Sequence, residues 1–261
     1  MCPILITIPT PFGQIPIHTY GVLVAAGFLI GILLAERNAR NYGIKKEVIA
    51  DLGFYIVIAA LIGSRLLFVI TEYKHYVEHP LEFFKVWEGG LIFYGGLLAA
   101  VPTAIFYIRK QGVPVLKVAD VFAPYMPLGH GIGRLGCFSA GCCYGNPTDS
   151  FCGVTFTDPN SLAPQGIPLH PTQLYEAFGN FGIFLILIAF RKKQTYSGQL
   201  FFLYGTMYST LRFINEFFRG RDTKYLILNT ISFSQLISIL FFTLSVFMLI
   251  YLKKKKTAST S

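Results

Sequence analysis

The stretch GHGIGRLGCFSAGCCYGNPT, residues 129–148, places His130 and Arg134 four residues apart at the end of an apolar segment, just before a turn rich in glycine and cysteine. An arginine in such a segment is costly in a bilayer, so it needs an internal carboxylate or an anionic ligand. Glycines at 129, 131, 133 and 136 allow a neighbouring backbone to approach closely. The stretch therefore predicts a closely packed membrane helix with a polar group for pairing or for binding.

The composition around this stretch is that of a membrane protein. Of 261 residues, 53% are hydrophobic and 13% are charged, and the mean hydropathy is +0.55. A soluble domain of this length is less apolar. The formal charge of +9 does not indicate nucleic-acid binding, because Lys and Arg fall in short clusters beside apolar runs rather than on one basic face. We therefore expect membrane lipids, and no nucleic acid, as partners.

Seven apolar runs are close to the ~20 residues that a spanning helix needs. They lie at roughly 19–35, 52–72, 91–108, 118–137, 173–190, 198–218 and 231–252. The expected fold class is an all-α polytopic membrane protein, with seven transmembrane helices in a single integral membrane domain over 1–261. The run at 118–137 is the least regular, because Pro124, Pro127 and several glycines interrupt it.

Basic residues are sorted between alternate loops. The clusters that follow runs one, three, five and seven are Arg37, Arg40, Lys45 and Lys46; Arg109, Lys110 and Lys117; Arg191, Lys192 and Lys193; and Lys253 to Lys256. The positive-inside rule places these loops in the cytoplasm, with the N-terminus outside and the C-terminus inside. The loop 138–172 has no Lys or Arg and is rich in turn residues, so it predicts a small irregular outer head with little apolar content. Thr172 is the expected N-cap of the helix that follows.

Three arginines, Arg65, Arg134 and Arg212, lie inside apolar runs. Such residues mark functional sites or buried ion pairs. The candidate carboxylate partners are Glu72, Asp120, Glu176 and Glu216. Arg212 and Glu216 have the spacing of a pair within one helix. Arg65 has no companion motif, which favours a structural role for it.

Four of the five cysteines fall in or beside the outer loop, at Cys137, Cys142, Cys143 and Cys152. They do not form the paired CxxC pattern of a zinc site. We expect at least one disulfide among them, joining Cys152 to Cys142 or Cys143, because a bridge between adjacent cysteines is strained. A redox or metal site is the alternative.

A family resemblance extends over nearly the whole chain, in six segments. These are HTYG at 18–21, GSR at 63–65, HPLEFFKVWEGGLIFYGG at 79–96, GRLGCF at 133–138, HPTQLYE at 170–176 and YSTLRFINEFFR at 208–219. Together they resemble bacterial prolipoprotein diacylglyceryl transferase. The resemblance implies an inner-membrane enzyme that moves the diacylglyceryl group of phosphatidylglycerol onto the lipobox cysteine of a prolipoprotein signal peptide. A thioether forms, glycerol phosphate leaves, and no metal or organic cofactor is required.

The charged residues suit this chemistry. A guanidinium binds phosphate in a bidentate fork and can hold the charge of the leaving group, so Arg134 and Arg212 are the predicted phosphate ligands and catalytic residues. The resemblance also implies a wider set of substrate-binding residues: Tyr20, Gly145, His170, Gln173, Tyr175 and Glu216.

The chain departs from the family pattern at several positions. The family usually has GRxGNFxNxExxG where this chain has GRLGCFSAGCCYG, so Cys137, Ala140 and Cys142 replace two asparagines and a glutamate. The usual histidine of the FHGG segment is Tyr94, which removes the obvious base for activating the incoming thiol. Tyr94 remains a catalytic candidate.

His130 is the other candidate for activating the thiol, because it lies one helical turn before Arg134. A hydrogen bond within the bundle is its alternative role. Two other functions also remain open: a family-like membrane protein whose cysteines form a redox or metal site, and a transporter or scaffold that only binds phospholipid.

Overall fold

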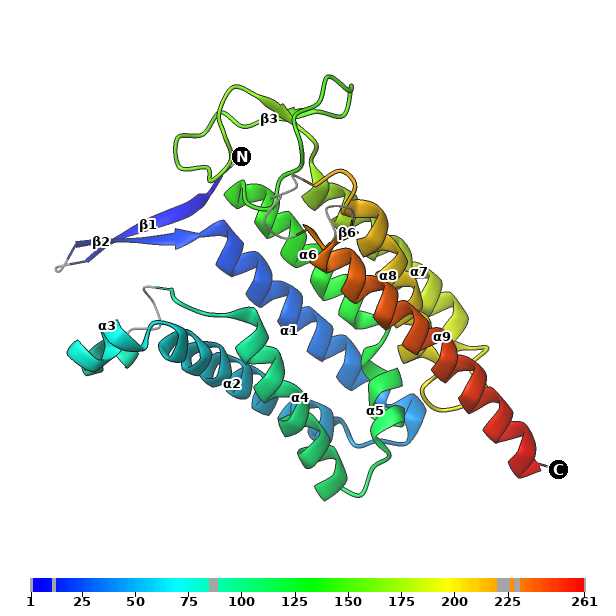
Figure 1. Ribbon diagram of the computed structural model, residues 1–261. Coiled ribbons are helices and arrows are strands. Elements are labelled where there is room, and N and C mark those ends of the chain that lie inside the picture. Colours follow the sequence, from blue (N-terminus) through cyan, green and yellow to red (C-terminus); the bar gives the residue numbers. More distant parts are fainter. Residues whose placement is uncertain (1, 11–12, 85–88, 220–225, 228–230, 261) are drawn as a thin grey trace. The chain divides into compact units, whose positions relative to one another are not determined.

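The computed structural model describes residues 2–10, 13–84, 89–219, 226–227 and 231–260, and most of them are helical (Figure 1). Each of the seven predicted runs contains a helix. Contacts divide the chain into two compact units, a larger one of Met1–Leu34 with Ala119–Ser261 and a smaller one of Ala35–Val118. The single domain over 1–261 stays a prediction.

Four helical stretches within the described residues are long and apolar enough to cross a membrane. They are Thr19–Tyr42, Lys46–Thr71, Thr172–Arg191 and Phe233–Ala258, which match the first, second, fifth and seventh predicted runs. The others are shorter or less apolar; α4 (Phe93–Lys110) has 18 residues and α8 (Gln199–Asn215) has 17. The chain is therefore a helical membrane protein, and the count of seven spans stays a prediction.

The larger unit is a bundle in which successive helices pack in pairs (Figure 1). α6 (Tyr125–Ala140) packs against α7 (Thr172–Arg191), α7 packs against α8, and α8 packs against α9 (Phe233–Thr260). One buried apolar cluster of this unit consists of Ala123, Ile183, Leu187, Leu200 and Tyr204. This packing brings side chains of α6, α7 and α8 together.

Glycines form the contact between α1 (Thr19–Ala39) and α6, as the glycines of the 129–136 segment predict. A Cβ added to Gly27 would lie 2.7 Å from the carbonyl oxygen of Gly129, and one added to Gly136 would lie 3.2 Å from that of Tyr20. Since side chains do not fit at the first of these distances, only glycine permits the contact there. The start of α1 consequently lies beside the end of α6.

The run at 118–137 forms two helices rather than the one expected. α5 (Val115–Phe122) ends before Pro124, and α6 begins at Tyr125. Pro124 cannot donate a backbone hydrogen bond to a continuing helix, whereas Pro127 falls in the first turn of α6, where its missing N–H costs little.

Asp120 on α5 fixes the start of α8. Its buried carboxylate accepts hydrogen bonds from the Phe201 backbone N–H at 3.0 Å, from Gln194 Nε2 at 2.6 Å and from the Gly198 backbone N–H. Because a helix N-terminus has unpaired N–H groups and a partial positive charge, a carboxylate there is stabilising. Asp120 is thus a helix cap, although it was one of the candidate partners of the arginines.

The loop 138–172 is mostly irregular, as predicted, and it contains a small apolar core. Strands β3 (Val154–Thr155) and β4 (Pro168–Leu169) pair in an antiparallel sheet. Phe156, which follows β3 directly, is fully buried in a cluster with Ala163 and Leu169. The three apolar residues follow no periodic pattern in the sequence, so the sequence does not predict this core.

Two further hairpins depart from the all-α expectation. β1 (Ile4–Thr10) pairs with β2 (Gly13–His18), and β2 leads directly into α1 (Figure 1). β5 (Leu226–Ile227) pairs with β6 (Ile231–Ser232) just before α9. These strands are short additions to a helical protein.

The smaller unit is built on α2 (Lys46–Thr71) and α4, with η1 (Arg40–Tyr42), α3 (Tyr73–Glu78) and η2 (Pro80–Phe84) around them. The two long helices touch at glycines, because a Cβ added to Gly63 would lie 2.4 Å from the Gly95 carbonyl oxygen. Small residues at this point let the two backbones meet.

Candidate functional site

A buried carboxylate organises the larger unit's polar centre. Glu176 on α7 is 1% exposed, and its Oε1 lies 3.1 Å from Arg134 Nη2. Tyr208 OH donates to the same oxygen at 3.3 Å, and Asn215 Nδ2 donates to Oε2 at 3.1 Å. A buried ion pair is tolerated when its remaining polar atoms find partners, as these do. Glu176 therefore links α6, α7 and α8 through hydrogen bonds.

His130 is part of the same centre. Arg134 Nε donates a hydrogen bond to His130 Nε2 at 3.2 Å, and this ring nitrogen also lies 3.3 Å from Glu176 Oε1. A guanidinium keeps its protons, so Nε2 must be the acceptor in the first contact. The approach to Glu176 is then close but is not a second hydrogen bond. In this arrangement the lone pair of Nε2 is occupied, which makes His130 a poor base until the bond to Arg134 is released.

Arg212 on α8 forms the predicted pair with Glu216, with Nη2 and Oε2 2.8 Å apart. Nη2 also donates to Ser234 Oγ on α9 at 3.2 Å. Nη1 is buried and makes no hydrogen bond within the described residues. A buried N–H group without an acceptor is costly, and an anion would satisfy it.

Two arginines act electrostatically on one pair of aromatic rings. His130 and Tyr208 lie 5.2 Å apart between ring centroids, and the charges of both Arg134 and Arg212 act on each of these rings. Tyr208 was not among the predicted site residues. The sequence could have indicated Tyr208, because it precedes Arg212 by four residues and this spacing places both side chains on one face of α8.

The segment HPTQLYE holds the cysteine-rich turn in place. Thr172 Oγ1 donates to the Cys143 carbonyl at 2.7 Å, and Gln173 Nε2 donates to the Cys142 carbonyl at 2.6 Å. α7 begins at Thr172 and its N-cap residue is Pro171, so the prediction of Thr172 as the N-cap is wrong. Gln173 was predicted to bind substrate, and in the structure its amide group positions the turn.

Gly145 fits where no other residue would. Its N–H donates to the His170 carbonyl at 2.8 Å, and an added Cβ would lie 2.3 Å from the Phe218 carbonyl oxygen. The match to the family at this position therefore has a packing reason: the loop passes directly over the segment that follows α8.

His170 and Tyr175 form a second cluster with the outer loop. Tyr175 OH lies 3.1 Å from His170 Nδ1 and 3.0 Å from Cys152 Sγ. Hydrogen bonds with Ser150 and then Tyr175 lower the pKa of the Cys152 thiol. His170 and Tyr175 also pack edge-on against the Phe218 ring. This cluster fastens the loop to α7.

All five cysteines are free thiols, so the predicted disulfide is wrong. Cys152 pairs with Tyr175 instead, while the sulfur atoms of Cys137, Cys142 and Cys143 lie within 4.8 Å of one another. Hydrogen bonds with Cys137 and then Cys142 lower the pKa of Cys143. The fold has gathered three thiols at the end of α6.

The two tyrosines at the helix starts are both exposed. Tyr20 in the first turn of α1 is 45% exposed, and the charges of Arg134 and the three clustered cysteines act on it. Tyr94 in the first turn of α4 belongs to the smaller unit, is 53% exposed and contacts the Phe93 ring. Tyr20 is thereby placed beside the site, whereas the role of Tyr94 stays a prediction.

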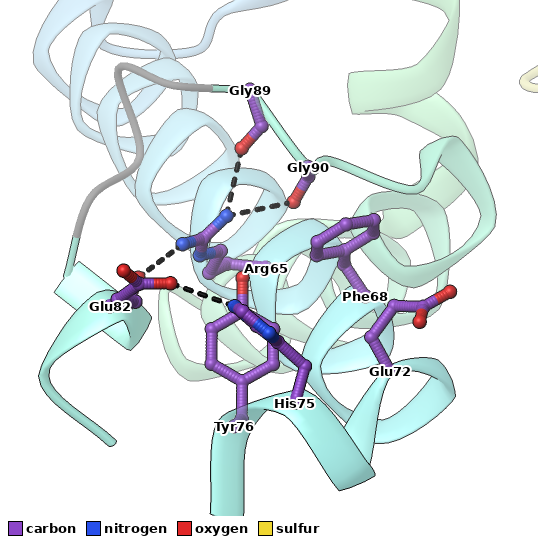
Figure 2. A pocket seen from close by; sticks show the side chains of 8 residues that line it. All are labelled: Arg65, Phe68, Glu72, His75, Tyr76, Glu82, Gly89 and Gly90. Carbon is purple, nitrogen blue, oxygen red and sulfur yellow. Dashed lines mark hydrogen bonds and ion pairs between the residues drawn. The ribbon is translucent and has the colours of Figure 1, made fainter. Parts of the chain in front are cut away.

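Arg65 is a structural cation, as its lack of companion motifs suggested. Its guanidinium is enclosed by backbone carbonyls, and Nε donates to that of Phe83 at 2.9 Å. Nη1 donates to Gly89 at 2.8 Å and to Gly90 at 3.3 Å, and Nη2 donates to Glu82 (Figure 2). The rings of Phe68 and Tyr76 and the side chain of Glu72 complete a cavity of ≈300 Å³ beside it. Its nitrogens thus stabilise the segment before α4.

Comparison of the sequence with known proteins identifies the family of this chain. The profile of the prolipoprotein diacylglyceryl transferase family matches residues 3–251. A phosphatidylglycerol–prolipoprotein diacylglyceryl transferase of Clostridium tetani is 33% identical over 231 residues, which cover 88% of this chain and 91% of the relative. One of Bacillus cereus is 35% identical over 256 residues, covering 97% and 94%. The chain therefore belongs to the prolipoprotein diacylglyceryl transferase family.

Proposed function

We propose that this protein transfers the diacylglyceryl group of phosphatidylglycerol to the lipobox cysteine of prolipoproteins. Its relatives carry names that state transfer from phosphatidylglycerol to prolipoprotein, and the similarity extends along almost the full length of both chains. The observation that carries the proposal is the buried centre in which Arg134, His130 and Tyr208 meet at Glu176, while the charge of Arg212 acts on both rings.

The two arginines would bind the lipid phosphate. Arg212 supports this role because its buried Nη1 is without an acceptor within the described residues. Glu176 and Glu216 hold the guanidinium groups in place when no lipid is bound. Phosphate accepts bidentate hydrogen bonds from a guanidinium, and it gains negative charge as the bond to carbon breaks. Cations that are already oriented stabilise this charge in the transition state.

The reaction is a displacement at carbon. The lipobox thiolate attacks the glyceryl carbon that is bonded to the phosphate oxygen, a carbon–sulfur bond forms, and the carbon–oxygen bond breaks. Glycerol phosphate leaves with the electron pair of that bond. A thiol with a pKa of about 8.5 is mostly protonated at neutral pH, so the site must activate it. Gln173, His170, Tyr175 and Gly145 would serve the substrate indirectly, by positioning the outer loop.

The proposed topology has seven spans, in which α5 and α6 form one broken span. The N-terminus and the head 138–172 face the outside of the bacterial inner membrane, and the C-terminus faces the cytoplasm. Sorting of the basic clusters supports this orientation. Single cysteines in an otherwise cysteine-free protein should label from outside at Asp149 or Asn160 and from inside at Lys193 or Lys254. The opposite labelling pattern would reject the orientation.

Purified protein in phosphatidylglycerol vesicles should convert a lipobox peptide into its diacylglyceryl thioether, detected by mass spectrometry. The same peptide with serine in place of the lipobox cysteine is the matched control and should stay unmodified. Complementation of a bacterium depleted of its transferase tests the function in cells. Binding of phosphatidylglycerol without any thioether product would favour the scaffold alternative instead.

A further inference from the structure

Three thiols converge at the end of α6, where the family pattern has other residues. The sulfur atoms of Cys137, Cys142 and Cys143 lie within 4.8 Å of one another. Around a tetrahedral zinc ion with Zn–S bonds of about 2.3 Å, neighbouring sulfurs are roughly 3.8 Å apart. Small side-chain rotations would close the difference.

The backbone holds this cluster in place. Gly141 ends α6 with φ of +73°, and Cys143 has φ of +59°, the one positive value among the described residues other than glycine. Such a conformation in a residue with a side chain points to a local constraint. The carbonyls of Cys142 and Cys143 are held by Gln173 and Thr172, both almost fully buried. The turn that presents the thiols is therefore preorganised.

We propose that Cys137, Cys142 and Cys143 bind a zinc ion whose fourth position takes the thiolate of the lipobox cysteine. The inference rests on the proposed transferase function. Thiolate sets favour zinc and other soft ions, and catalytic zinc sites typically have three protein ligands and one open position. A thiol that binds the ion is deprotonated outright. Zinc would thus supply the thiol activation that the family pattern assigns to the histidine replaced here by Tyr94.

The cluster is well placed for this role. Cys137 follows Arg134 by three residues on α6, so both side chains lie on the same face of the helix. The guanidinium groups of Arg134 and Arg219 act on Cys143 and offset part of the negative charge of three thiolates. The predicted phosphate ligand and the proposed thiolate site are therefore one helical turn apart.

The proposed step is balanced without any oxidant. The peptide thiol releases its proton to solvent water when it binds zinc. The bound thiolate attacks the glyceryl carbon, and glycerol phosphate leaves with the electron pair of the carbon–oxygen bond. The product thioether is neutral and a weaker ligand than a thiolate, so it dissociates and the fourth position reopens.

Metal content is measured first, on the full-length protein purified in detergent without chelators. We expect about one zinc per chain by elemental mass spectrometry, because a site of this kind holds a single ion. Cys137→Ser, Cys142→Ser or Cys143→Ser should lower this content, while Cys2→Ser, a matched change outside the cluster, should retain it. Protein with no zinc, with copper in its place, or with a disulfide within the cluster would overturn the proposal.

The open position is tested on the wild-type protein, so the result does not depend on whether the variants fold. Cobalt exchanged into the site should give a thiolate-to-cobalt absorption band that changes when the lipobox peptide is added. The serine-substituted peptide should leave the band unchanged. An absorption band that does not change when the lipobox peptide is added would identify a structural metal site and overturn the activating role.

Activity completes the test. Removal of zinc should lower the transfer rate by about 10²-fold or more, the typical contribution of activating a reacting group, and added zinc should restore it. Full transfer by metal-free protein would reject the zinc site and leave the transferase function intact. Zinc binding without any transfer would instead reject the transferase function.

Discussion

Replacing Glu176 with glutamine tests the arrangement of the polar centre most directly. The substitution keeps the shape of the side chain and removes its charge, which leaves the Arg134 guanidinium without the carboxylate 3.1 Å away. The Glu176 side chain is 2% exposed and the Arg134 side chain is 16% exposed, so water does little to solvate the charge that remains. Breaking a buried pair on one side typically costs about 3–5 kcal/mol, and we expect Glu176→Gln to lower the free energy of unfolding by about this amount.

The assay is chemical unfolding of the purified protein in detergent micelles. Asp149→Asn is the matched control, because it neutralises an exposed carboxylate in the outer loop and should change the stability by at most about 0.5 kcal/mol. Adding Arg134→Met to Glu176→Gln should recover part of the loss, since the uncompensated charge is removed with its partner. Equal stability of wild type and Glu176→Gln, or strictly additive losses in the double variant, would refute the pairing.

Further predictions concern phosphate binding, packing and thiol reactivity. Arg212→Lys should reduce diacylglyceryl transfer by about 10²–10³-fold with nearly unchanged thermal stability, because lysine lacks the bidentate geometry; wild-type activity would exclude the phosphate role. Gly145→Ala should destabilise the protein by about 1–3 kcal/mol, since its Cβ would lie 2.3 Å from a backbone oxygen, whereas Gly182→Ala, with open space around its Cβ, should not. The Cys152 thiol, whose pKa is lowered, should react with iodoacetamide at a pH below that of an ordinary thiol, and Ser150→Ala should shift this dependence upward; identical profiles would contradict the hydrogen bond.

The sequence determined the class of this protein and the positions of its helices. Apolar runs near the length of a bilayer span commit the backbone to helices, because every backbone polar group in lipid must be satisfied within its own segment. The glycines of α6 likewise indicated close helix contacts, and the structure places Gly129, Gly133 and Gly136 against α1 and Gly131 against Phe181 of α7. The break at Pro124 follows from the missing N–H of proline, although the apolar run 118–137 predicted one span.

Partners across helices were decided only by the tertiary structure. Four carboxylates were available to the intramembrane arginines, and composition could not show that Asp120 caps α8 while Glu176 pairs with Arg134. Only the pair of Arg212 with Glu216 was readable, since both residues lie on one helix at a fixed spacing.

The thiol cluster shows the same limit. Sequence spacing favoured bridges to Cys152, but the left-handed turn at Gly141 and Cys143 folds two cysteines back toward Cys137, while Tyr175 takes Cys152 as its partner. Local patterns specify helices because their hydrogen bonds join near neighbours in the chain. Side chains from distant segments meet only where packing brings them together, and that is where this site was formed.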